Sequence, residues 1–176
     1  AAEGKTFGRE ALDLERIIAM PAVQDASWVI EENVLLRAGD QQTVATLKGV
    51  EPQYLRMSKM AQYMYTGEPT FEGLAGPAAI IGIGLKSELG LPLDDGVMQP
   101  LEISAPIRGR KLSKFQQRAF ETTAIAVRGA FTMNMEFDLK YAVVPLDIAA
   151  DLLHYDSAVS ALELRLHFTQ DMDRVA

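Results

Sequence analysis

The most distinctive chemistry in this sequence is a local concentration of positive charge. Between Ala105 and Phe120 there are five cations and no acidic residue, and one phenylalanine lies among them: Arg108, Arg110, Lys111, Lys114, Phe115 and Arg118. The whole chain has a net charge of −7, so this segment is a positive patch on an acidic molecule. Such a patch attracts an anion, a lipid head group or an acidic partner protein, and an apolar residue beside cations suits a docking surface. We predict that these six residues bind a partner; ordinary solvated lysines and arginines are the alternative.

A second candidate for chemistry is the glycine pair in Gly82-Ile83-Gly84, which follows an apolar strand. Glycines at such a turn can hold a dinucleotide pyrophosphate at a helix N-terminus, with an acidic residue about 20 positions later on the ribose. Glu102 has that spacing, but Ser87 replaces the third glycine and Gly90 cuts the helix short. We therefore expect these glycines to allow close strand-to-helix packing. A small nucleotide-binding module or enzyme is kept as the alternative.

Residues for metal binding or acid-base catalysis are present but dispersed. They are Asp94, Asp95, Glu136, Asp138, His154 and His167. The two histidines lack the spacing of a helical ligand pair, and no serine lies in a G-x-S-x-G nucleophile turn. We expect Asp94 and Asp95 to form a turn and Glu136-Phe137-Asp138 to form a polar turn between strands. The sequence thus predicts no enzyme, no cofactor and no metal site.

Composition indicates a folded domain and narrows the class of protein. Hydrophobic residues make up 48% and charged residues 23% of 176 residues, which is enough apolar surface for one domain or two small lobes. The net charge of −7 opposes nucleic-acid binding by bulk electrostatics. The absence of cysteine excludes disulfides, thiolate catalysis and zinc ribbons, and is compatible with an oxidising compartment.

We expect no membrane span within the sequence. The longest apolar run, Leu74 to Leu85, is broken by glycine and proline and is shorter than the roughly 20 residues that a bilayer requires. Ala1 to Phe7 lacks the basic start and apolar core of a signal peptide, and Asp171 to Ala176 resembles the first turn of a helix. These ends favour an excised piece of a longer protein over a cytosolic chain.

The elements that must position these residues follow from periodicity and turn chemistry. In the first part of the chain, we predict a helix over Arg9–Met20, a hairpin of strands Ser27–Arg37 and Gln42–Val50 around Ala38-Gly39-Asp40, and a short helix from Glu51-Pro52. The stretch from Met57 to Tyr65 is rich in methionine and tyrosine, and its form is ambiguous.

A turn-rich passage, Gly67 to Gly76, is the predicted boundary between two lobes. Beyond it we predict strands at Ala78–Ile81, Val97–Ile103, Thr123–Phe131, Lys140–Val144 and Ala158–Phe168, and helices at Leu85–Leu89 and Leu146–Leu153. In the last strand, leucines alternate with Glu163 and Arg165, which indicates one solvated face. We expect this strand to rejoin the first lobe.

Several short phrases of the sequence carry a family resemblance. They are Met20-Pro21-Ala22-Val23, Leu47-Lys48-Gly49-Val50-Glu51-Pro52, Ala79-Ile80-Ile81-Gly82-Ile83-Gly84-Leu85, Leu89-Gly90, Val127-Arg128-Gly129-Ala130-Phe131, Phe137-Asp138-Leu139-Lys140-Tyr141-Ala142-Val143-Val144-Pro145-Leu146 and Ser160-Ala161-Leu162-Glu163-Leu164. In order and spacing they resemble the periplasmic core domain of MacB/FtsX-type ABC transporter permeases, especially the LolC/LolE lipoprotein-releasing subfamily. The resemblance covers nearly the whole chain.

The resemblance implies an α+β architecture. A Porter-like α/β lobe would be built from both chain ends, residues 1–66 and 157–176, and an inserted, mostly β Sabre-like lobe would occupy residues 67–156. It also implies membrane helices before Ala1 and after Ala176, a separate cytoplasmic ATPase subunit and a dimer of permeases in the complete complex. The fragment would then be a periplasmic domain of a bacterial inner-membrane protein.

In function, the resemblance implies a domain that couples ATP hydrolysis in the cytoplasm to lipoprotein release or export, by mechanotransmission and partner docking. In LolC-like members a loop of the Sabre-like lobe binds the periplasmic lipoprotein chaperone, and Ala105 to Phe120 occupies that place in the chain. The LolC-like loop is flanked by prolines, whereas here Pro106 stands at one side only and the segment is basic. A LolE-like role in receiving lipoprotein, a MacB-like export role and a mechanical relay without chaperone contact stay open.

Overall fold

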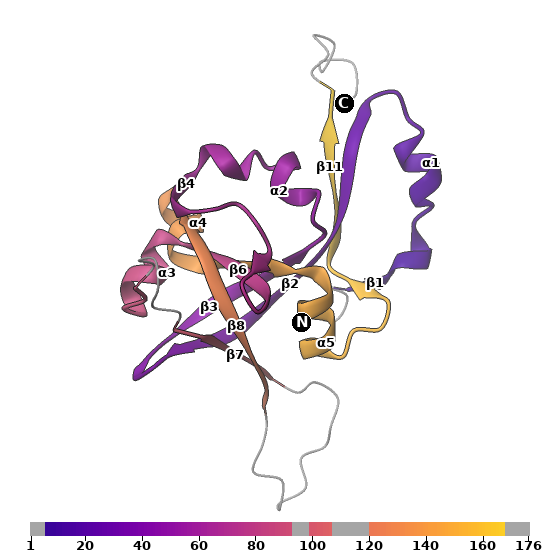
Figure 1. Cartoon of the computed structure of the whole chain (residues 1–176). Helices are drawn as coiled ribbons and strands as arrows, with labels where there is room; N and C mark the ends of the chain where they lie inside the picture. The colour runs from indigo at the N-terminus through magenta and orange to yellow at the C-terminus, as the bar shows by residue number, and fades with distance from the viewer. Residues whose placement is uncertain (1–5, 93–98, 107–119, 168–176) are drawn as a thin grey trace, which may run out of the picture.

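The computed structural model describes residues 6–92, 99–106 and 120–167, and it confirms a mixed α+β fold dominated by one sheet (Figure 1). The strands are β1 (Phe7–Gly8), β2 (Val23–Ala38), β3 (Gln41–Val50), β4 (Met64–Gly67), β5 (Glu72–Gly73), β6 (Gly76–Gly82), β7 (Leu101–Pro106), β8 (Phe120–Phe131), β9 (Tyr141–Pro145), β10 (Ala158–Val159) and β11 (Ala161–Leu166). The α-helices are α1 (Leu14–Ile18), α2 (Tyr54–Met57), α3 (Ile83–Glu88), α4 (Met135–Lys140) and α5 (Leu146–Leu153), and the 3₁₀ turns are η1 (Arg9–Ala11) and η2 (Met60–Gln62).

The main sheet closes on itself. Within the described residues its order is β4-β8-β7-β2-β3-β9-β6-β5, and β11 pairs with β2 beside this path. A further, parallel pairing joins β6 to β8, so that β8, β7, β2, β3, β9 and β6 form a ring of hydrogen-bonded neighbours. Strands β2 and β3, from before Gly67, therefore share one sheet with strands from after it. The division of the chain into lobes at Gly67 stays a prediction.

Alternation along the strands divides the apolar residues between two clusters. Ile81 and Val144 belong to the larger cluster, whereas their sequence neighbours Ile80 and Val143 belong to the smaller one. Successive side chains of a strand point to opposite faces of a sheet, so both faces of the central strands are buried. Helices α3 and α5 contribute Leu85, Ala149 and Leu152 to the larger cluster, to which Leu89, directly after α3, also belongs. Tyr54 of α2 and Phe137 of α4 pack against the smaller cluster.

The strongest local predictions are confirmed. β2 and β3 form the predicted antiparallel hairpin, with Ala38 opposite Gln41 and Gly39 in the left-handed region at φ +56°. Helix α5 has the predicted bounds, and its start after Pro145 agrees with the fixed backbone angle of proline. The last strand does rejoin the first part of the chain, because β11 pairs antiparallel with β2.

Two local predictions are wrong. Glu136-Phe137-Asp138 is not a turn but lies within α4, because the Asn134 side chain accepts a hydrogen bond from the Phe137 amide at 3.1 Å and so caps a helix. The single helix predicted over Arg9–Met20 is divided into η1 and α1. Asp13 causes the division, since its side chain accepts a hydrogen bond from the Arg16 amide at 3.1 Å and starts a new helix.

The first six residues of β2 extend away from the ring. Residues 23–28 of β2 pair with β11, whereas the pairing of β2 with β3 begins at Val29. We call these two segments, residues 23–28 of β2 together with β11, the ribbon. Figure 1 shows the ribbon projecting from the sheet with α1 alongside it. None of the helices in the described ranges is long and apolar enough to cross a membrane.

Candidate functional site at the base of the ribbon

The predicted docking residues fall outside the part of the chain that the structure describes. They are Arg108, Arg110, Lys111, Lys114, Phe115 and Arg118. The described residues on either side of the segment are adjacent, because β7 and β8 run antiparallel until Pro106 lies opposite Phe120. Phe120 is 53% exposed. The role of the six residues in docking stays a prediction.

The glycine pair Gly82 and Gly84 packs against α4. A Cβ atom at Gly82 would lie 2.2 Å from the Asp138 carbonyl oxygen, and one at Gly84 would lie 2.8 Å from the same oxygen. Backbone therefore occupies the space beside both glycines. Helix α3, which they open, has six residues. The structure thus favours a role for these glycines in close packing against helix α4 over a role in a phosphate-binding turn.

Among the dispersed acidic and histidine residues, Asp138 and His154 contact nearby groups. Asp138 accepts hydrogen bonds from the Thr132 hydroxyl at 2.9 Å and the Met133 amide at 2.8 Å, and His154 lies 3.3 Å from the Glu121 carboxylate. Asp94 and Asp95 lie outside the described residues. Across residues 6–92, 99–106 and 120–167, no group of three or more histidine, aspartate or glutamate side chains is placed to hold a metal ion.

The unusual polar group of the structure is Lys48, a buried cation at the base of the ribbon. Its side chain is 6% exposed, and its ammonium lies 3.1 Å from the Glu31 carboxylate and 2.5 Å from the Glu163 carboxylate. It also faces two aromatic rings, at 5.1 Å from the centroid of Tyr54 and 5.9 Å from that of Tyr141. Lys48 belongs to β3, Glu31 to β2 and Glu163 to β11, so one cation joins three strands.

Electrostatics keep this lysine charged. Burial by itself would lower the pKa of Lys48, but the neighbouring Tyr54 and the carboxylates of Glu163 and Glu31 more than compensate, and its pKa lies above the usual value for lysine. Burial raises the pKa of Tyr54. Burial and the nearby Glu31 raise that of Tyr141. All three groups therefore hold their protons at neutral pH, and Lys48 acts as a permanent positive charge.

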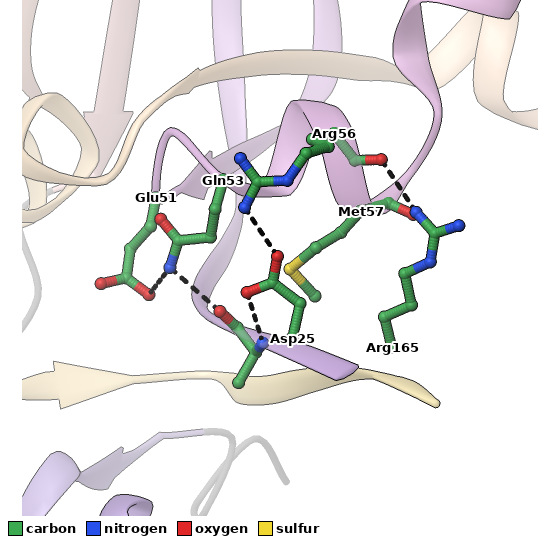
Figure 2. Close-up of polar contacts among 7 residues, drawn as sticks. Asp25, Glu51, Gln53, Arg56, Met57 and Arg165 are labelled. Carbon is green, nitrogen blue, oxygen red and sulfur yellow. Dashed lines mark hydrogen bonds and ion pairs between the residues drawn. The ribbon is translucent and has the colours of Figure 1, made fainter. Parts of the chain in front are cut away.

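Helix α2 is fastened to the ribbon by side chains from both strands (Figure 2). Arg56 donates to the Asp25 carboxylate at 2.8 Å. Gln53 donates to the Ala26 carbonyl at 2.9 Å, and Arg165 of β11 donates to the carbonyls of Arg56 and Met57 at 3.1 and 3.3 Å. The Arg165 contacts cap the C-terminal carbonyls of α2, and all of these contacts together hold the helix over the ribbon.

Two further side chains fix the strands where the ribbon leaves the ring. The Ser160 hydroxyl accepts a hydrogen bond from the Glu31 amide at 2.9 Å, which ties the start of β11 to β2. The Glu51 carboxylate accepts hydrogen bonds from the Trp28 amide at 2.9 Å and from Gln53 at 3.0 Å. We define the ribbon junction as the contacts of Ser160 and Glu51 together with those of Lys48 and those that fasten α2 to the ribbon. It cross-links strands and a helix, and offers no nucleophile paired with a base.

Two surface hollows adjoin the ribbon junction. One, of about 340 Å³, is lined by polar side chains: Glu31, Glu32, Asn33, Thr46, Tyr141 and Ser160. The other, of about 490 Å³, lies beside α2 and is mostly apolar: Pro52, Leu55, Arg56, Ala61, Pro69, Thr70, Phe71 and Glu72.

The sequence pattern predicts no site at the ribbon junction. Its one visible signal is Lys48 itself, a charged residue inside the apolar run from Leu47 to Val50. Charged residues are almost never buried unless they are paired, so a lysine in such a strand predicts a partner. Hairpin register identifies Glu31 as the cross-strand neighbour. Glu163 could not be identified in that way, because it comes from the other end of the chain.

No protein-family model matches the sequence, and comparison with curated proteins finds no match. Solved structures do match. The extracellular domain of the noncanonic ABC-type transporter YknZ from Gram-positive bacteria superposes with a TM-score of 0.61 at 16% identity, over 99% of this chain and 79% of that one. The periplasmic region of MacB from Actinobacillus actinomycetemcomitans superposes with a TM-score of 0.56 at 9% identity, over 90% of this chain and 65% of that one. The chain therefore has the fold of the extracellular domain of YknZ and the periplasmic region of MacB.

Proposed function

We propose that this chain is the extracytoplasmic domain of an ABC transporter permease. The observation that carries the proposal is the likeness in fold to the extracellular domain of YknZ along 99% of the chain. The sequence phrases that resemble MacB/FtsX-type permeases support it independently. In this proposal a cytoplasmic ATPase subunit drives the permease, and membrane segments of the complete protein connect the two. The domain lies in the periplasm of a bacterium, outside the inner membrane.

Within the permease, the domain works as a mechanical relay and not as an enzyme. A relay must transmit displacement between its parts without absorbing it, which requires stiff connections between the moving elements. The ribbon junction supports this role, since Lys48 links three strands and Arg165 links β11 to α2. The engaged state of Asp138 and the packing around Gly82 also favour a relay over catalysis.

The more specific part of the proposal is partner docking. The basic residues from Arg108 to Arg118 dock a periplasmic lipoprotein chaperone or a lipoprotein, and the transported cargo is a lipoprotein. Charge and place along the chain support this assignment, together with the LolC/LolE resemblance. A relay without chaperone contact is the competing role, and a domain that folds but binds no periplasmic partner would favour it.

The topology of the domain is tested in the full-length protein. The chain contains no cysteine, so a cysteine at Val44, which is 69% exposed, gives a single reactive site in it once any other cysteines of the protein are replaced. We expect a membrane-impermeant maleimide to label this site in intact spheroplasts, and the protein to co-purify with an ATPase subunit. A matched cysteine at buried Leu47 should react only after denaturation. Labelling at Val44 only after cell lysis would contradict the proposal.

Docking is tested by replacing the five cations of the segment with serine and measuring binding of the periplasmic chaperone by the domain. We expect binding to be lost. The matched control replaces five cations elsewhere with serine, namely Arg16, Arg37, Lys59, Lys86 and Lys140, and changes the net charge equally. Unchanged binding after the first set of replacements would remove the segment from the mechanism while leaving the proposed topology intact.

A further inference from the structure

The outer edge of β11 is unpartnered in the part of the chain that the structure describes. β11 pairs with β2 along one side, and none of the described strands pairs with the other side. An edge strand presents unpaired backbone N–H and C=O groups, which another strand can complete. Leu164 and Leu166 of this strand are 41% and 48% exposed. The edge is therefore both polar along its backbone and apolar on one face.

The residues of this edge are complementary to themselves. The sequence Leu162-Glu163-Leu164-Arg165-Leu166 has leucine at alternate positions, with an acid and a base at the two positions between them. If two copies pair antiparallel with Leu164 on the two-fold axis, Glu163 of each copy lies opposite Arg165 of the other, and Leu162 lies opposite Leu166. Opposite charges directly across an antiparallel pair are favourable. The register that pairs the charges also places all the leucines on one face.

The two charged side chains retain hydrogen-bonding capacity for such a pairing. Lys48 binds one carboxylate oxygen of Glu163, and Arg165 uses one terminal nitrogen for the α2 carbonyls. A carboxylate has a second oxygen, and a guanidinium has further N–H donors. Figure 2 shows Arg165 approaching the C-terminal end of α2, which lies over the face of the ribbon. The contacts within one copy therefore do not exhaust either group.

We propose that β11 pairs antiparallel with β11 of a second copy of this chain, centred on Leu164, to form a continuous β2–β11–β11–β2 sheet. The unpaired edge and the charges of β11 favour this pairing whether or not the proposed function holds. Six residues per strand bury much less than the roughly 1,200–2,000 Å² of a stable interface. We therefore expect the isolated chains to associate weakly, and the contact to matter where two copies are held close together.

The pairing is tested by covalent trapping, which detects weak association. Leu164→Cys places two cysteines opposite each other on the axis, at the separation of a cross-strand pair, and we expect a disulfide-linked dimer on mild oxidation. Val44→Cys, on an exposed position of β3, is the matched control and should cross-link at least several-fold more slowly. Equal rates for the two variants would overturn the proposal.

The register is tested by mixing two variants. In the proposed pair Leu162 faces Leu166 of the other copy, whereas the two copies of Leu162 lie roughly 14 Å apart, too far for a disulfide. A mixture of Leu162→Cys and Leu166→Cys should therefore cross-link faster than either variant alone. Adding Leu164→Lys to both cysteine variants places two ammonium groups on the axis and should suppress the mixed cross-link. Adding Val44→Lys to both should leave the cross-link unchanged. Equal rates in mixed and unmixed samples would overturn the register. If the cysteines introduced in β11 react with a thiol reagent but never form a cross-link, another strand occupies the edge and the proposal is overturned.

Discussion

Lys48 of β3 and Glu163 of β11 meet at 2.5 Å across the intervening strand β2. They are separated by 115 positions in the chain, so this ion pair joins the first hairpin to the last strand. The Lys48 side chain is 6% exposed and that of Glu163 is 38% exposed. The carboxylate stays partly hydrated while the ammonium does not, which makes Lys48 the more sensitive partner to replace.

We predict that Lys48→Met lowers the free energy of unfolding by about 2–3 kcal/mol. Removing one partner of a buried ion pair leaves the other partner uncompensated and costs about 3–5 kcal/mol, and partial hydration of Glu31 and Glu163 reduces that cost. The measurement is urea unfolding monitored by Trp28 fluorescence. Lys140→Met is the matched control, because Lys140 forms an exposed i,i+4 pair with Glu136, worth about 0.5 kcal/mol or less. A loss at Lys48 no larger than at Lys140 would contradict the prediction.

Stability is expected to fall above about pH 10 through the same groups. The pKa values of Lys48, Tyr54 and Tyr141 are all raised in the folded protein. Between the ordinary values of these groups and the raised ones, the folded protein holds protons that the unfolded chain has lost, so the free energy of unfolding decreases with rising pH. Below about pH 9 these groups should contribute no slope.

The origin of the alkaline slope is checked with two pairs of tyrosine replacements. The double variant Tyr54→Phe, Tyr141→Phe should lose less stability between pH 9 and pH 11 than the wild type. The double variant Tyr63→Phe, Tyr65→Phe removes two exposed tyrosines and should keep the wild-type slope. Identical slopes in the two double variants would exclude the ribbon junction as the source.

Glu51 is predicted to stabilise the protein mainly by accepting a hydrogen bond from the buried Trp28 amide, beside its second donor, the Gln53 side chain. Its carboxylate accepts from the Trp28 N–H at 2.9 Å, and Trp28 is 5% exposed. Glu51→Ala leaves this donor without its acceptor, which costs about 1–3 kcal/mol. Glu51→Gln keeps a side-chain oxygen in place and should recover most of the loss. Thermal unfolding of the two variants distinguishes them, and equal destabilisation would show that the charge and not the acceptor is needed.

Gly82→Ala is expected to destabilise the protein by about 1–3 kcal/mol, because overpacking against a rigid neighbour displaces backbone. The added Cβ would lie 2.2 Å from the Asp138 carbonyl oxygen. The matched control is Ser87→Ala on the same helix, where the exposed hydroxyl bonds to the Ile83 carbonyl of its own helix and the change should stay within about 0.5 kcal/mol. Urea unfolding gives both values, and a neutral Gly82→Ala would contradict the close packing.

If the glycines serve packing, nucleotides should not stabilise the domain. We expect no change in melting temperature with millimolar ATP or NAD. A ligand present far above its dissociation constant stabilises the folded state by several kcal/mol, so a shift of several degrees would revive the nucleotide-binding alternative. The two outcomes are distinguishable without knowledge of the transported cargo.

Local patterns predicted those elements whose signals lie within a few residues. The hairpin of β2 and β3 follows from alternation around Gly39, and α5 follows from Pro145 and its apolar stripe. The prediction failed at Glu136 to Asp138, because a cap supplied by Asn134 turned three polar residues into a helix. The same residue types, Asn and Asp among them, are favoured both at helix N-caps and in turns. The sequence pattern by itself therefore could not distinguish a capped helix from a turn.

The sequence by itself determined the class of the fold, the first hairpin, the alternation of β11 and the isolation of positive charge between Ala105 and Phe120. Only the tertiary structure decided that β6 joins β8 to close the ring, and that Lys48 meets Glu163 at the base of the ribbon. Local elements follow from the backbone geometry and side-chain period of neighbouring residues. Pairings between distant segments depend on how the whole apolar surface is buried at once, which no short stretch of sequence specifies.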